Sequence, residues 1–214
     1  LGLICIPFLF FSSIYLYKPA RLWIRGIFFF LKYVAKITHE IQGYENVPKE
    51  PVLIISKHQS AFETLALFFY LKNTIFIHKK QLYLIPIFGL YLKKINMISI
   101  DRKSGAAAMR QMLKETHKRK LDGYSIIIFP EGTRKVPNAI PDYKSGFIGI
   151  YKEMNTKILP VALNSGLCWP KNKLAMKRGN IIIKILPTIK SGMDKKDVFP
   201  MVESVIEKAT NKIT

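Results

Sequence analysis

Short apolar runs alternate with amphipathic stretches from residue 37 to the end of the chain. Near-continuous apolar runs predict β-strands at 37–44, 51–56, 74–78, 95–100, 124–129, 157–163 and 180–187. The intervening stretches predict helices at 60–72, 84–93, 104–121, 145–154 and 197–212. Because strands that are apolar on both faces must be covered on both faces, this alternation indicates an α/β fold. We expect a mixed, largely parallel sheet flanked by helices.

The first 36 residues have a different pattern. Residues 1–17, LGLICIPFLFFSSIYLY, contain no charge. As a helix they would be about 26 Å long, slightly short of a hydrocarbon layer of about 30 Å. The next stretch, KPARLWIRGIFFFLKYVAKI, gathers its cations within a helical sector of about 60°. These cations are Lys18, Arg21, Arg25, Lys32 and Lys36.

An apolar segment followed by a cationic amphipathic helix is typical of a chain that lies on an anionic membrane. The pattern therefore predicts an N-terminal two-helix membrane-docking segment at 1–36 and an α/β domain at 37–214. A buried core helix and a solvated charged face are the alternatives. Whether residues 1–17 cross the bilayer or lie in one leaflet stays open.

The net charge of the chain narrows the classes of molecule that it is expected to bind. The chain has 34 Lys and Arg against 14 Asp and Glu, a formal net charge of +20. Such a field attracts nucleic acid, phospholipid headgroups or phosphorylated substrates. An apolar content of 49% argues against a disordered chain. The two cysteines, Cys5 and Cys168, form no metal-binding or disulfide pattern, and we expect reduced thiols in a cytoplasmic setting.

Polar clusters follow three of the predicted strands. Residues 57–60 (KHQS) follow PVLIIS, residues 101–103 (DRK) follow INMISI, and residues 130–134 (PEGTR) follow SIIIF. If these strands are parallel, the clusters emerge at one edge of the sheet, where α/β proteins bind ligands. The sequence therefore predicts that His58, Arg102 and Arg134 share one pocket.

The cluster around His58 admits a structural and a chemical interpretation. Ser60 and Glu63 match a capping box, with Ser60 as the N-cap of the following helix. A carboxylate bent back to the helix start could also accept the Nδ1 proton of His58, which would leave Nε2 free to act as a general base. Ser60 lacks the GxSxG context of a hydrolase nucleophile. An external alcohol is the simpler proton source.

The arginine clusters suit a phosphate. Arg102 and Arg134 carry forked donors, Gly132 lets the backbone approach an anion, and Thr133 adds a hydroxyl. Glu131 is expected to brace this loop by accepting backbone or arginine protons. Each arginine taken alone could equally be a surface charge.

These blocks resemble the glycerolipid acyltransferase family, particularly the bacterial 1-acylglycerol-3-phosphate acyltransferases. HQSAFE, ISIDR, FPEGTR and ILPVAL are similar to four family blocks, in order, over about residues 38 to 165. FPEGTR is complete and highly specific, whereas a histidine with an acid five residues later is weak alone. The chain departs from the family in having Glu63 where Asp is usual and Lys57 where Asn is common.

The resemblance implies a role for each matching residue. His58 is the implied general base and Glu63 its orienting acid. Arg102 and the residues of the FPEGTR loop, Glu131, Gly132, Thr133 and Arg134, are the implied substrate-binding residues. The implied reaction moves a fatty acyl group from acyl-CoA or acyl carrier protein to lysophosphatidate, giving phosphatidate in phospholipid synthesis. It requires no cofactor and no metal, since the acyl thioester is a co-substrate.

The implied setting is an anionic phospholipid membrane, at the cytoplasmic face of the inner (plasma) membrane. Alternative acceptors are glycerol 3-phosphate and another lysophospholipid, and a lipid hydrolase would use water. A rival of another class is a non-enzymatic protein that binds anionic lipid or nucleic acid by charge. No nucleic-acid partner is expected, because no basic-aromatic recognition motif is present. Acyl-chain length, donor and oligomeric state are left open.

Overall fold

The computed structural model describes residues 14–86, 88–101, 104–171 and 175–214. Its helices are α1 Ile14–Tyr33, α2 Phe62–Tyr70, α3 Phe88–Lys94, α4 Gly105–Leu121, α5 Gly146–Met154 and α6 Lys195–Ile213. Its strands are β1 Ile37–Gln42, β2 Leu53–Ser56, β3 Thr74–Lys79, β4 Ile98–Ile100, β5 Ser125–Ile128, β6 Ile158–Leu163 and β7 Gly179–Ile185. Short 3-10 helices occur at η2 Tyr44–Asn46, η3 Lys80–Leu84 and η5 Ser165–Leu167. Every strand and helix predicted from residue 37 onward is present, within a few residues at each end.

The strands form one seven-stranded sheet in the order β1-β7-β6-β2-β5-β3-β4. Strands β6, β2, β5, β3 and β4 run parallel to one another. β7 pairs antiparallel with β6, and β1 is parallel to β7, so these two strands run against the rest. The predicted mixed, largely parallel sheet is confirmed.

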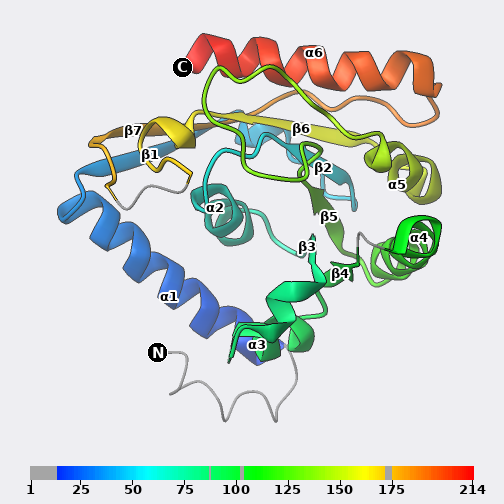
Figure 1. Cartoon of the computed structure of the whole chain (residues 1–214), viewed down its shortest axis with the longest axis horizontal. Coiled ribbons are helices and arrows are strands. Elements are labelled where there is room, and N and C mark those ends of the chain that lie inside the picture. The colour runs from blue at the N-terminus through cyan, green and yellow to red at the C-terminus, as the bar shows by residue number, and fades with distance from the viewer. Residues whose placement is uncertain (1–13, 87, 102–103, 172–174) are drawn as a thin grey trace.

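Helices cover both faces of the sheet (Figure 1). α6 lies along β6 on one face, whereas α1 and α2 lie on the other. All residues of β2 and β6, at the centre of the sheet, are buried. Burial on both faces is the reason for their nearly unbroken apolar sequences.

Parallel pairing brings the polar clusters to one edge. β2 lies beside β5 with Ile55 level with Ile128, so residues 57–60 and 130–134 leave the sheet at the same level. β4 lies two strands beyond β5 in the sheet, and its Ile100 is level with Lys79 of β3. The sheet therefore delivers the ends of β2, β5, β3 and β4 to its carboxyl edge, as the sequence predicted.

The N-terminal segment is one helix over its described part. Of the predicted two-helix segment at 1–36, residues 1–13 lie outside the described residues. α1 runs through residue 18 without a break and contains Pro19. The reason is an apolar stripe that continues across this point and packs on the domain. This stripe consists of Leu16, Ala20, Ile24, Phe28 and Leu31.

The cationic stripe expected on α1 is only partly exposed. Lys18, Arg25 and Lys32 are exposed, and so is Lys36, which lies beyond the end of α1. Arg21 is half-buried and donates a 2.6 Å hydrogen bond to the Phe69 carbonyl oxygen. Large apolar side chains are exposed as well, namely Leu22, Trp23, Phe29, Phe30, Tyr33 and Val34. No described helix has both the length and the apolar character needed to cross a bilayer.

Candidate active site

His58 and Glu63 are hydrogen-bonded where β2 turns into α2. Nδ1 of His58 donates to Oε1 of Glu63 at 2.8 Å. His58 precedes the helix and Glu63 lies in its first turn, so the two side chains meet although they are five residues apart. The predicted contact is present, and the glutamate spans the distance where aspartate is usual in the family that the sequence resembles.

The Glu63 carboxylate is fully buried and surrounded by donors. Oε1 also accepts the backbone N–H groups of Gln59 and Ser60, both at 2.7 Å. Oε2 accepts the hydroxyl of Ser165 at 2.7 Å and lies 2.8 Å from the hydroxyl of Ser60. Burial alone raises the pKa of Glu63, but the hydrogen bond and charge of His58, with the bonds from Ser165 and Ser60, bring it below its ordinary value. The group is therefore a carboxylate that only accepts, and it holds the proton on Nδ1.

The predicted capping box is confirmed in one half only. Glu63 accepts the N–H of Ser60, as the box requires. The helix, however, begins at Phe62 with Ala61 at the N-cap, and the Ser60 hydroxyl accepts the N–H of Phe62 rather than that of Glu63. Ser60 is completely buried, and its hydroxyl also lies 2.9 Å from that of Ser165. Its position suits a role in holding Glu63.

The imidazole of His58 is fixed between the loop and the sheet. Its ring stacks on that of Phe129 with centroids 4.0 Å apart and planes 16° apart. Phe129 in turn stacks on Phe76 of β3 at 5.9 Å. The side chain of His58 is 16% exposed and lines a large cavity. The hydrogen bond to Glu63 and the stack together orient the ring toward that cavity.

The loop after β5 is bonded to the histidine cluster. The Lys135 N–H donates to the His58 carbonyl at 2.8 Å, and the Gly132 N–H donates to the Phe129 carbonyl at 3.0 Å. Gly132 has a φ of 66°, a conformation that a side chain would strain. The glycine predicted from the FPEGTR block is thus required by the turn that brings Thr133 and Arg134 to the cavity.

Glu131 occupies a different place from the substrate-binding residues with which it was predicted. It is buried beneath the loop and is absent from the cavity lining. Its Oε2 accepts the backbone N–H of His58 at 2.8 Å, and its Oε1 lies 2.8 Å from Nζ of Lys57. The expected bracing contact with the backbone is present. Burial, with the nearby charge of Glu207, raises the pKa of Glu131 above its ordinary value, although Lys57 and the His58 N–H act to lower it.

Lys57 extends this contact to the C-terminal helix. Its Nζ lies 2.7 Å from Oε1 of Glu207 on α6, and the Tyr143 hydroxyl donates to the same oxygen at 2.8 Å. Burial lowers the pKa of Lys57, but the bonds to Glu131 and Glu207 outweigh it and leave the pKa above its ordinary value. Lys57 is therefore a buried cation between two carboxylates.

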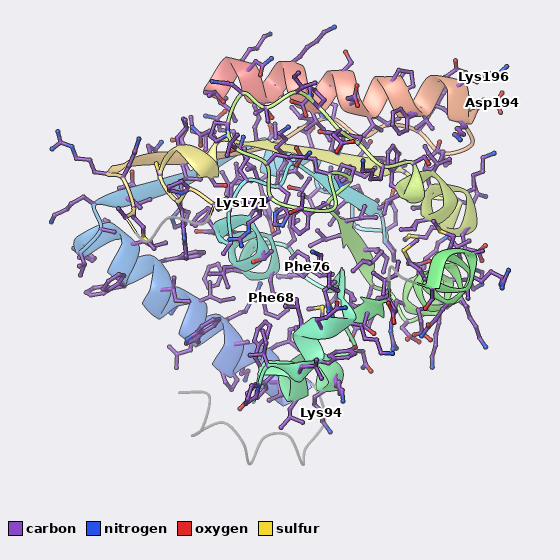
Figure 2. The ribbon with its side chains drawn as sticks, in the orientation of Figure 1. Phe68, Phe76, Lys94, Lys171, Asp194 and Lys196 are labelled. Atoms are coloured by element: carbon purple, nitrogen blue, oxygen red, sulfur yellow. The ribbon has the colours of Figure 1, made fainter. Side chains whose placement is uncertain are left out.

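The cavity beside His58 has a volume of about 1050 Å³. Polar side chains enter it from the loops and from the end of β3, among them His58, Lys79, Thr133, Arg134, Lys144 and Lys171. Most of the remaining lining is apolar and comes from α1, α2, β3, α3 and α4. Phe68 of α2 and Phe76 of β3 lie in the space between α1 and β3 (Figure 2). One imidazole and several cations thus adjoin a long apolar wall.

The fold brings four of the predicted site residues together. His58, Gly132, Thr133 and Arg134 line the same cavity. Arg102 lies outside the described residues, so its expected position in this pocket stays a prediction. The Thr133 hydroxyl accepts from Nζ of Lys171 at 3.4 Å.

Four functional candidates were not singled out from the sequence, namely Lys79, Ser165, Lys171 and Glu207. Lys79 ends β3 and Ser165 follows β6, so the rule that selected the three polar clusters would have found both if it had been applied to every parallel strand. Glu207 had no such signal, because it lies in an amphipathic helix remote in sequence from Lys57.

The described residues contain no group of His, Cys, Asp and Glu side chains suited to a metal ion. Cys168 is a buried free thiol. Burial raises the pKa of that thiol, so it is not activated as a nucleophile. Cys5 lies outside the described residues. Among the described residues, the chemistry is concentrated at the imidazole–carboxylate pair and the cations that share its cavity.

Comparison with known proteins gives similarity over most of the chain. A family model described as Acyltransferase matches residues 38–164. A 1-acyl-sn-glycerol-3-phosphate acyltransferase of Pseudomonas aeruginosa is 33% identical over 167 residues, which cover 78% of this chain and 65% of the relative. A protein of the same name from Limnanthes alba is 30% identical over 152 residues, covering 70% of this chain and 54% of the relative. The chain thus spans less than two thirds of the length of either relative.

The fold is similar to that of a solved structure. The crystal structure of the 1-acyl-sn-glycerophosphate (LPA) acyltransferase from Thermotoga maritima superposes with a TM-score of 0.77 at 20% sequence identity. The match covers 94% of this chain and 82% of that one. At this identity the likeness concerns the fold.

Proposed function

The chain belongs to the acyltransferase family, and we propose that it moves a fatty acyl group from an acyl thioester to the free hydroxyl of 1-acylglycerol 3-phosphate, giving phosphatidate. One observation carries the proposal. The imidazole of His58, bonded through Nδ1 to buried Glu63, lines the same cavity as Arg134 and an apolar wall. The names of the relatives from Pseudomonas aeruginosa and Limnanthes alba support the same acceptor.

In the proposed reaction His58 is the general base. Its Nε2 takes the proton of the acceptor hydroxyl as the oxygen attacks the thioester carbonyl, so that a C–O bond forms and the C–S bond breaks. The buried carboxylate of Glu63 stabilises the imidazolium that results. The leaving thiolate has a conjugate acid of pKa about 8.5 and recovers the proton from His58. No covalent intermediate on the protein is required.

The phosphate of the acceptor would bind to the cations at the polar part of the cavity. Arg134 offers a forked guanidinium, and Lys79, Lys144 and Lys171 supply further positive charge. Arg102, from the sequence, is proposed to join them. The cluster matches the dianionic headgroup of a lysophosphatidate better than a neutral acceptor.

The apolar part of the cavity would hold a fatty chain. Its volume, about 1050 Å³, is at the upper end of ordinary small-molecule sites, as a long hydrocarbon requires. Acyl-CoA and acyl carrier protein are both proposed as donors, since each presents an acyl thioester and each is anionic. The exposed apolar face of α1 and the net charge of +20 support attachment to an anionic membrane, which we place at the cytoplasmic face of the inner membrane.

The test is thiol release by the purified protein with lysophosphatidate and either donor. The His58→Ala variant should lose about 10²- to 10⁴-fold in turnover, as expected for removal of a general base. Glycerol 3-phosphate and a different lysophospholipid, offered in competition, identify the acceptor. Free fatty acid formed without an acceptor would instead indicate a lipid hydrolase. Unchanged turnover in His58→Ala would overturn the mechanism.

A further inference from the structure

The segment from Lys79 to Lys94 has an unusual arrangement of charge. Its sequence is KKQLYLIPIFGLYLKK, in which a pair of lysines stands at each end, no acid occurs, and the interior is almost entirely apolar. It comprises the end of β3, the 3-10 helix η3 and the helix α3. Nothing in the proposed chemistry explains why the outer side of this segment is apolar.

Several of its large apolar side chains face outward. Leu84 is 81% exposed, Ile85 45% and Leu90 52%, and Phe88 is 42% exposed although it also lines the cavity. Single exposed leucines are ordinary, but a group of this kind within seven residues forms a patch that soluble surfaces rarely carry. The inner side of the segment, through Leu82, Tyr91 and Leu92, lines the apolar cavity. The segment is therefore apolar on both sides.

The segment lies beside α1. α3 is next to the N-terminal end of α1 (Figure 1), and Trp23 of α1 lines the same cavity as Phe88 while remaining 44% exposed. Two elements that enclose the cavity thus both present apolar side chains outward. The exposed lysines Lys80 and Lys93 belong to the same segment.

We propose that residues 79–94 form a membrane-contacting element, distinct from α1, that places Leu84, Ile85 and Leu90 in the outer hydrocarbon of an anionic phospholipid bilayer. Lys80, Lys93 and Lys94 bind the lipid phosphates above them. Apolar residues bracketed by lysines match a layer in which anionic headgroups overlie hydrocarbon. This inference rests on the proposed function for its lipid substrate, but it concerns a separate surface.

The lysines of the segment distinguish a bilayer from other partners that could cover its apolar side chains. A second copy of the chain would bring the lysines of one segment against those of the other, at a cost from like charges. An acidic protein would satisfy the lysines but would also need an apolar patch of its own to cover the exposed leucines. The chain's own residues 1–13 are apolar and carry no charged side chain to meet the lysines. A bilayer supplies both an anionic headgroup layer and the hydrocarbon beneath it.

The first experiment reads depth in the membrane at single positions. Leu84→Trp and Leu90→Trp are bound to phosphatidylglycerol vesicles whose lipids carry brominated acyl chains. Their fluorescence quenching is compared with that of the unsubstituted protein, which contains Trp23 and Trp169. We expect additional quenching at both positions. The matched control is Leu121→Trp at the end of α4, where the leucine is 75% exposed but lies outside the segment, and it should gain none.

The second experiment measures binding without turnover. Leu84→Ser/Leu90→Ser should lower the molar partition coefficient into phosphatidylglycerol vesicles by about tenfold or more. Leu121→Ser/Ile140→Ser removes similarly exposed apolar side chains outside residues 79–94 and should leave the partition coefficient unchanged. With detergent-dispersed substrates both double variants should turn over like the parent, so a failure here is distinguishable from a failure of the proposed function.

Two results would overturn the proposal. One is the absence of any additional quenching in the Leu84→Trp and Leu90→Trp variants, as expected for Leu121→Trp, which would place the segment outside the bilayer. The other is a fall in melting temperature or a change in oligomeric size for Leu84→Ser/Leu90→Ser in the absence of lipid, because the patch would then be covered by protein.

Discussion

The ammonium nitrogen of Lys57 lies 2.7 Å from Oε1 of Glu207, which joins the C-terminal helix α6 to the residue preceding His58. The same nitrogen lies 2.8 Å from Oε1 of Glu131, whose other oxygen accepts the backbone N–H of His58. α6 thus contributes to the site without lining the catalytic cavity. A buried cation shared between two carboxylates thus links α6 to the loop after β5 and to the start of the His58 loop.

Removal of that cation should destabilise the protein. Lys57→Met leaves buried Glu131 without its partner, and we expect a loss of about 3 kcal/mol in unfolding free energy. Urea denaturation followed by circular dichroism measures it. Lys208→Met, the same substitution on the exposed side of α6, serves as the control and should change stability little. Equal losses in the two variants would contradict the role assigned to Lys57.

The Lys57–Glu207 pair should behave as one unit. Glu207→Gln keeps the shape of the side chain and removes its charge. The losses from Lys57→Met and Glu207→Gln should therefore not add in the double variant, with a coupling of about 1 kcal/mol or more. Additive losses would show that the two residues act independently.

Glu63→Gln should reduce turnover less than His58→Ala does. The amide can keep part of the hydrogen-bonding geometry, but it cannot stabilise an imidazolium by charge. A loss of about 10- to 10²-fold in kcat is expected, with a smaller change in KM. Glu50→Gln, at an exposed position, is the control. Full activity of Glu63→Gln at neutral pH would exclude Glu63 as the group that orients His58.

The stability of the fold should depend on pH through Glu63. Burial raises its pKa, yet His58, Ser165 and the Ser60 N–H hold it below the ordinary value of 4.5. The unfolded chain therefore binds this proton more readily than the folded chain. The stabilisation is fully present above pH 4.5 and is lost as the pH falls through the lower pKa of the folded state.

The measurement compares the parent with Glu63→Gln. The difference in unfolding free energy between them should shrink as the pH falls below 4.5, through the lower pKa of the folded state. The subtraction cancels Glu131, whose pKa is raised and which acts in the opposite direction. A difference that stays constant over this range would contradict the depressed pKa of Glu63.

Ser165→Ala should weaken the support of Glu63. The Ser165 hydroxyl donates to Oε2 at 2.7 Å in a fully buried setting, so its removal should cost about 1–3 kcal/mol of stability. Turnover should fall with it, because the carboxylate loses a donor that holds it against His58. Ser145→Ala, at an exposed serine whose side chain makes no capping hydrogen bond, is the control. A loss of stability that leaves kcat intact would separate Ser165 from the catalytic pair.

Arg134→Gln should discriminate between acceptors by their phosphate. We expect kcat/KM for lysophosphatidate to fall by about tenfold or more, since a forked charge-assisted contact is lost. Monoacylglycerol, which lacks the phosphate, should be affected much less. Arg178→Gln, at an exposed position before β7, is the control. An equal effect on both acceptors would move Arg134 away from the phosphate.

The local pattern of apolar and polar residues was sufficient to predict the secondary structure and part of the site. Hydrophobic period identified the strands and helices of residues 37–214, and apolar continuity indicated that the strands are covered on both faces. The contact between His58 and Glu63 followed as well, because it depends only on a strand end followed within a few residues by a helix start. The common cavity of His58 and Arg134 followed from the parallel pairing of β2 and β5.

Contacts between distant segments had no local signature. Glu207 meets Lys57 only because α6 packs along β6, and a charged residue beside an amphipathic stripe looks like any solvated one. Arg21 shows the same limit, since its helical sector marked it as exposed whereas the Phe69 carbonyl holds it half-buried. Glu131 could be assigned to a loop, but the direction of its side chain depends on where Lys57 lies.

The amino-acid order thus determines which residues are available at each strand end, because period and turn chemistry act over a few neighbouring positions. Which of them face the cavity, and which lie beneath it as Glu131 does, is decided when β2, β5 and α6 pack together. That packing buries charges which must then find partners, and the partners lie wherever the fold brings them, however far apart they are along the chain.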